Sequence, residues 1–123
     1  MQHRPKSLNL FQVRLSINAI VSILHRISGM ILFLILPFLL LAMYVSLESE
    51  SGFICVVALM KHWLFKMFLI GVSWVFFHHF YAGLRHLCQD MNWMTNLREA
   101  SYSGRIVLFL DLVSVMLFAR MVW

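Results

Sequence analysis

The sequence is poor in charged residues. Only 12% of its 123 residues are Asp, Glu, Lys or Arg, against roughly 25% in an average soluble domain. Glycine and proline are also scarce, with five and two residues, which excludes collagen-like chains. There are only two cysteines and no Cys-x-x-Cys-His motif, so both a disulfide scaffold and a covalently attached c-type haem are excluded.

Hydrophobic side chains make up 62% of the chain. A protein this short buries only about two-thirds of its unfolded surface in water, so it cannot hide that much apolar area in a core of its own. The surrounding solvent must therefore be lipid. The net charge is +5, but the basic residues are scattered and form no aromatic-rich basic run, which argues against a nucleic-acid partner.

Three apolar segments are candidate membrane helices. The first runs without a charge from Ile27 to Leu47, the second lies between Lys66 and Arg85, and the third contains Asp111. The first is long enough to cross a bilayer, and its single proline is tolerated in a membrane helix. The sequence predicts one all-α membrane domain over residues 1–123, with transmembrane helices at about 20–47, 60–88 and 104–123.

The basic residues between and beside these segments are asymmetric. Seven of them lie before or at the start of helix one, or between helices two and three. The other three lie on or near the opposite side of the membrane. The seven are Arg4, Lys6, Arg14, Arg26, Arg85, Arg98 and Arg105. The positive-inside rule then places the N-terminus in the cytoplasm and the C-terminus in the periplasm.

A first polar cluster lies at the start of the first apolar segment. Ser22, Arg26 and Gly29 are spaced i, i+4, i+7 and share one helical stripe, with His25 beside them. A hydroxyl, a fixed cation and bare backbone on one face suit a flat ligand with carbonyl oxygens. The alternative is that His25 and Arg26 only mark the helix end by reaching lipid headgroups.

A second cluster lies at the end of the second segment. His79, Gly83, His86 and Asp90 fall within about 40° of one another on a helix. An imidazole at membrane depth needs a partner, and haem iron is a natural one, with Gly83 leaving room for a porphyrin edge. Arg85 and His86 are then expected near the haem propionates. The alternative is a buried histidine bonded to a neighbouring helix.

Two further ionisable residues are expected inside the membrane. His78 is rotated by about 100° from His79, so it faces a partner or lipid headgroups and cannot reach around the ring to supply a second axial ligand. Asp111 is expected to pair with an Arg or a His across the bundle, His78 among them, but the sequence does not select the partner.

Taken together, the motifs resemble the cytochrome b556 subunit of succinate dehydrogenase, in its bacterial form. The resemblance rests on Arg4-Pro5, Ser7-Leu8-Asn9-Leu10, the run from Ser22 to Gly29, and the run from His79 through Arg85-His86 to Asp90. It covers about residues 4–90, and the third helix adds only general hydrophobicity. Lys6 and Gln89 depart from the usual family pattern, but both lie outside the proposed ligand stripes.

The resemblance implies a role for each matching residue. His79 matches the axial ligand of haem b, Ser22 and Arg26 match residues of the ubiquinone pocket, and His25, Arg26 and His86 are expected near the haem propionates. It also implies half of a heterodimeric helix bundle that shares the haem with a second hydrophobic anchor in the bacterial inner membrane. An iron–sulfur subunit and a flavoprotein subunit complete the complex. This chain has no flavin, dinucleotide or iron–sulfur motif, so it is not expected to oxidise succinate itself.

Other functions remain open on the sequence alone. One is the anchor of a quinol:fumarate reductase, which runs the same chemistry in reverse. Another is a structural anchor without haem. A small transporter or a self-contained dihaem cytochrome fits worst, because only His78 and His79 lie deep in the membrane and a dihaem bundle needs four axial histidines.

Overall fold

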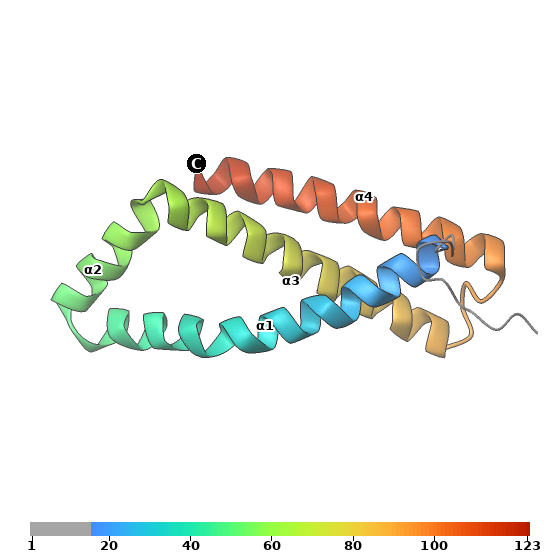
Figure 1. Cartoon of the computed structure of the whole chain (residues 1–123), viewed down its shortest axis with the longest axis horizontal. Coiled ribbons are helices and arrows are strands. Elements are labelled where there is room, and N and C mark those ends of the chain that lie inside the picture. Colours follow the sequence, from blue (N-terminus) through green and yellow to red (C-terminus); the bar gives the residue numbers. More distant parts are fainter. Residues whose placement is uncertain (1–15) are drawn as a thin grey trace, which may run out of the picture.

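The computed structural model describes residues 16–123, all of whose regular structure is helical. The sequence expectations for residues before 16, including Arg4-Pro5 and Ser7-Leu8-Asn9-Leu10, lie outside the described residues. Figure 1 shows four helices in chain order: α1 (Ile17–Glu48), α2 (Glu50–Lys61), α3 (Trp63–Asp90) and α4 (Leu97–Val122). The all-helical prediction is confirmed for this part of the chain.

Short polar residues set the first helix boundaries. The Ser16 side chain accepts a hydrogen bond from the Ala19 amide and caps the start of α1. Ser49 is extended, with φ −157° and ψ 157°, and its hydroxyl caps α2 through the Gly52 amide. The short α2 was not predicted as a separate element, and its 12 residues are too few to cross a bilayer.

The connection between α3 and α4 is a tight turn of six residues, 91–96. Asn92 and Met94 both have positive φ, at 61° and 55°. Asn tolerates this left-handed region, whereas it is uncommon for Met. The turn reverses the chain, so that α4 runs back along α3 (Figure 1).

The helices pack unequally. α4 lies beside α3 along most of its length, and the end of the chain returns to the start of α3, where Lys66 Nζ lies 5.4 Å from the centre of the Trp123 ring. The side-chain hydrogen bonds of α1 to the other helices all come from its N-terminal half, and its later part diverges from α3 toward α2 (Figure 1). The functional candidates therefore lie where three helices meet.

The surface is apolar and the interior is small and polar. Phe33 and Phe38 of α1 are 76% and 72% exposed, while the buried apolar cluster consists of Val21, Ala82 and Val107. Among the described helices, α1 and α3 are long and apolar enough to cross a membrane by length and composition. This inverted pattern is expected for a chain that lies in lipid and packs against other subunits.

Candidate functional site

Helix α3 carries two adjacent stripes with different surroundings. Val75, His78, Ala82 and Arg85 follow i, i+3, i+7, i+10 spacing, and all four are buried. His79, one residue after His78, is turned by about 100° and is only half-buried. The first stripe packs α3 into the bundle, and the second borders the candidate site.

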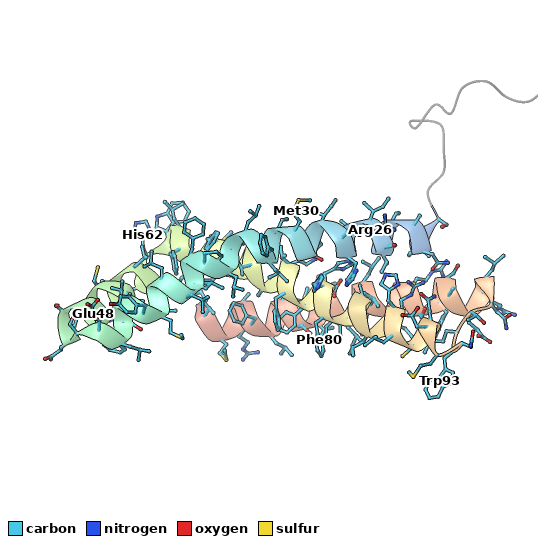
Figure 2. The ribbon with its side chains drawn as sticks, turned by 90° about the horizontal axis from the view of Figure 1, so that it is seen from below. Arg26, Met30, Glu48, His62, Phe80 and Trp93 are labelled. Atoms are coloured by element: carbon cyan, nitrogen blue, oxygen red, sulfur yellow. The ribbon has the colours of Figure 1, made fainter. Side chains whose placement is uncertain are left out.

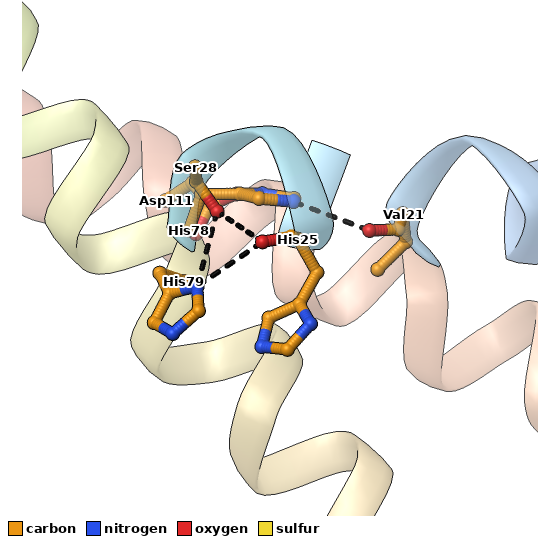
Figure 3. Close-up of polar contacts among 6 residues, drawn as sticks. All are labelled: Val21, His25, Ser28, His78, His79 and Asp111. Atoms are coloured by element: carbon orange, nitrogen blue, oxygen red, sulfur yellow. Dashed lines mark hydrogen bonds and ion pairs between the residues drawn. The ribbon is translucent and has the colours of Figure 1, made fainter. Parts of the chain in front are cut away.

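The His79 ring is held by the backbone of α1. Its Nδ1 lies 3.1 Å from the carbonyl oxygen of His25 and 3.3 Å from the Ser28 hydroxyl, and that hydroxyl donates to the same carbonyl at 2.8 Å. Figure 3 shows these contacts converging on one side of the ring. Because a carbonyl oxygen can only accept, Nδ1 carries the proton, and the lone pair of the neutral imidazole is on Nε2.

Two further imidazoles continue the site from His79. The ring of His25 is stacked on it, with centroids 4.3 Å apart and planes 6° apart, and the His86 ring lies 5.0 Å from His25. All three rings are half-buried. The structure thus brings His25, His79 and His86 into one cluster. The helical spacing predicted that His79 and His86 share a face, and His25 joins them from α1.

The two glycines of the sequence clusters are covered by these rings. A Cβ added at Gly29 would lie 2.8 Å from Cε1 of His79, and one added at Gly83 would lie 3.4 Å from Nε2 of His25. The bare backbone expected to receive a flat ligand at Gly29 instead receives an imidazole. Gly29 is therefore required for the close approach of α3 to α1.

Ser22 and Arg26 lie on α1 one helical turn apart. Ser22 is half-buried and Arg26 is exposed, and neither side chain makes a hydrogen bond within residues 16–123. Figure 2 shows Arg26 on the opposite side of the molecule from Phe80 and Trp93. Both polar groups are thus open to a ligand or a partner, beside the turn that carries His25.

The expectation that Arg85 lies near haem propionates is wrong. Arg85 is 6% exposed, and its guanidinium points into the bundle, where it donates to the Ser103 hydroxyl at 3.0 Å, to the Asn18 side chain at 3.0 Å and to the Ala100 carbonyl at 3.2 Å. These bonds tie α3 to both α1 and α4. Its neighbour His86, on the other stripe, stays beside the histidine cluster.

His78 and Asp111 form a buried pair. Nδ1 of His78 lies 2.6 Å from Oδ2 of Asp111, and the two residues are 0% and 2% exposed. Nε2 of His78 lies 3.4 Å from the Val21 carbonyl oxygen, and the Trp74 ring is stacked on the imidazole. Of the partners that the sequence left open for Asp111, the structure selects His78, which faces neither lipid nor headgroups.

Sequence reasoning missed one contributor to the site. Ser28 is 1% exposed and links the His25 carbonyl to His79, although it was noted only as part of a motif. A serine that donates to the carbonyl three residues earlier is common in helices and gives no distinct signal. The one sequence signal for its role is its position directly before Gly29, where the His79 ring of α3 lies close to the α1 backbone.

The site does not suit a bare metal ion. No group of three or more His, Cys, Asp or Glu side chains among residues 16–123 is arranged to hold one. A haem iron, by contrast, takes four ligands from its own ring and needs only one or two side chains from the protein. Within the described chain Nε2 of His79 makes no hydrogen bond, so it is available as such a ligand.

Comparison with known proteins points to one family. The family of succinate dehydrogenase/fumarate reductase transmembrane subunits matches residues 1–118. The chain is 31% identical over 122 residues to the succinate dehydrogenase cytochrome b556 subunit of Coxiella burnetii, covering 98% of this chain and 97% of the relative. It is 30% identical over 106 residues to the cytochrome b556 subunit of Paracoccus denitrificans, with 86% and 82% covered. It is also 30% identical over 126 residues to the cytochrome b560 subunit of Reclinomonas americana, with 98% and 85% covered. The chain therefore belongs to the succinate dehydrogenase/fumarate reductase transmembrane subunit family.

Proposed function

We propose that this chain is a membrane-anchor subunit of succinate:ubiquinone oxidoreductase, in which His79 ligates a haem b and Ser22 and Arg26 form part of the ubiquinone-reduction site. The observation that carries the proposal is the bond between His79 Nδ1 and the His25 carbonyl. Histidine ligands of metals generally donate their second ring N–H to such an acceptor, which orients the ring and leaves the other nitrogen free.

The neighbouring side chains suit the edge of a haem. His25 is stacked on His79, His86 lies beside His25, and Arg26 lies one residue after His25 on the outer side of α1. Imidazole and guanidinium groups are hydrogen-bond donors for propionate oxygens. When bound, haem b supplies one-electron redox chemistry within the membrane.

In this proposal a second protein ligand to the haem iron would come from another subunit. His78 cannot provide it, because both of its ring nitrogens already face acceptors inside the bundle. His25 and His86 are assigned to the propionates. The haem therefore lies between this chain and a second hydrophobic anchor, and the exposed apolar faces of α1 and α3 are available for that partner.

Ser22 and Arg26 bind and polarise the quinone. The Arg26 guanidinium carries a fixed positive charge in a site of low dielectric constant, where it stabilises the negative charge that develops on a quinone oxygen during reduction. The Ser22 hydroxyl donates a hydrogen bond to a quinone carbonyl and orients the ring. Succinate oxidation and electron delivery belong to the flavoprotein and iron–sulfur subunits of the complex.

Three helices cross the membrane in this proposal. α4 is 26 residues long, and its one charged residue between Arg105 and Arg120 is Asp111, which is paired with His78. The asymmetry of the basic residues places the N-terminus in the cytoplasm and the C-terminus in the periplasm of a bacterial inner membrane.

Replacement of His79 tests the haem assignment. We expect His79→Ala to abolish or convert the low-spin b spectrum of the purified complex, while the hydrophilic subunits still co-purify. His62→Asn is the matched control, because His62 is exposed and Asn retains an acceptor for the cap that it forms on Leu64. A normal low-spin spectrum from the His79→Ala complex, or a wild-type complex that contains no haem, would overturn the proposal.

A further inference from the structure

We propose that the buried pair His78–Asp111 is a positioning device for the haem ligand. It sets the rotation of α3 about its own axis, so that the next residue, His79, keeps Nδ1 on the His25 carbonyl and Nε2 free. This inference rests on the proposed role of His79.

At the level of His78, α3 is in contact with both α4 and α1 through this one side chain. His78 is bonded through Nδ1 to Asp111 on α4, and its Nε2 faces the Val21 carbonyl of α1 at the longer distance of 3.4 Å. Figure 3 shows the His78 side chain directed toward Val21, away from the His79 ring. An imidazole bonded to α4 and lying against the backbone of α1 cannot rotate without breaking the hydrogen bond to Asp111.

Asp111 adds to this constraint because its carboxyl group has no other side-chain hydrogen-bond partner among the described residues. Among the described residues its Oδ1 is buried without a hydrogen-bond partner, so His78 provides the only side-chain bond to this carboxyl group. A buried carboxyl group with one partner loses all of its hydrogen bonding if that partner moves. The pair therefore favours a single arrangement of α3 against α4.

The geometry of His79 requires that constraint. Side-chain atoms lie about 5–6 Å from a helix axis, so a rotation of about 20° moves them by about 2 Å. The Nδ1–carbonyl distance at His79 is already 3.1 Å, close to the upper limit of about 3.2 Å for such bonds. A small rotation of α3 would thus break the contact that orients the ligand.

A second α3–α4 contact provides the matched control. The Tyr81 hydroxyl and the Ser114 hydroxyl are 2.8 Å apart and join the same two helices about one turn from His78. Tyr81→Phe removes that hydrogen bond without changing the position of His78. If the pair acts only by adding stability between α3 and α4, both contacts should behave alike.

The experiment compares purified complexes by electron paramagnetic resonance of the ferric haem and by haem content per flavin. For Asp111→Asn and for the double variant His78→Phe/Asp111→Leu, we expect a shifted or broadened low-spin signal. We also expect haem retention on dilution to fall about 10-fold, as when other ligand-orienting partners are lost. The double variant replaces both members with apolar side chains, so it keeps the helices packed where a single change could unfold the chain.

The possible outcomes separate the two proposals. Altered signals in the Asp111 variants with a normal signal in Tyr81→Phe support the positioning role. Unchanged signals in both Asp111 variants, or equal losses in those variants and Tyr81→Phe, overturn it while leaving the haem assignment in place. Absence of haem from the wild-type complex overturns the proposed function itself.

Discussion

The close approach of α3 to α1 at Gly29 leads to a graded prediction for three glycines. A Cβ at Gly29 would lie 2.8 Å from Cε1 of His79, one at Gly83 would lie 3.4 Å from His25, and one at Gly71 would meet nothing within 4 Å. Carbon atoms pack best at about 3.5–4.0 Å, so Gly29→Ala must displace the His79 ring by roughly 0.8 Å or push the helices apart. Gly83→Ala makes an ordinary contact, and Gly71→Ala makes none.

The magnitudes follow from two opposing effects. Replacing a helical glycine with alanine stabilises by up to about 1 kcal/mol through backbone entropy, which is all that Gly71→Ala should show. Overpacking costs about 1–3 kcal/mol, so Gly29→Ala should be destabilised by about 0–2 kcal/mol after that gain. We expect Gly29→Ala to lower haem content clearly even if the free energy of unfolding changes little. The reason is that a displacement of roughly 0.8 Å exceeds the tolerance of about 0.5 Å within which ligand side chains must be held.

The assay is the haem-to-flavin ratio of the purified complex together with its thermal unfolding. We expect the ratio to be lowest for Gly29→Ala, slightly reduced or unchanged for Gly83→Ala, and unchanged for Gly71→Ala. If Gly29→Ala retains the haem content and spectrum of Gly71→Ala, then His79 does not depend on the backbone of α1, and the reasoning is refuted.

Three other perturbations test different parts of the structure. Arg26→Leu should impair ubiquinone reduction but leave succinate oxidation by an artificial hydrophilic acceptor intact, and normal quinone reductase activity would contradict the assignment of Arg26. A reporter fused after Trp123 should be exported, whereas activity confined to the cytoplasm would contradict the three-span topology. Arg85→Leu should destabilise the chain by about 3 kcal/mol, from three hydrogen bonds at about 1 kcal/mol each, and unfolding at the wild-type temperature would contradict the inward position of Arg85.

The helices and the shared face of His79 and His86 could be predicted because both depend on local spacing. Uncharged runs give the long helices, and the i, i+7 spacing of His79 and His86 places them on one face whatever the tertiary packing. The short α2 lay in a stretch assigned to a connection. Its only local signals are Ser49 at the cap and Glu50 in the first turn.

The inward turn of Arg85 could not be predicted, and the partner of Asp111 could not be selected among the candidates, because both depend on the register between helices. Arg85 lies near the end of an apolar segment, where the general tendency of arginine to reach the membrane surface favours an outward position. Its actual partners, Asn18 and Ser103, are 67 and 18 residues away in sequence. Nothing within α3 indicates that they lie within reach.

The dependence of Asp111 on His78 has a consequence for how the chain enters the membrane. In the proposed three-span topology, an aspartate at the centre of a helix adds about 2.5–3.5 kcal/mol to the free energy of insertion, so α4 would be a poor substrate for insertion on its own. The compensating imidazole lies 33 residues earlier, on α3, and will already have been synthesised when α4 leaves the ribosome. α3 and α4 should therefore enter the lipid together as a hairpin, and the His78–Asp111 contact would form during biogenesis, before haem or a second anchor is present. Shortening the six-residue connection between Asp90 and Leu97 would then impair insertion of α4 before it affected any electron transfer.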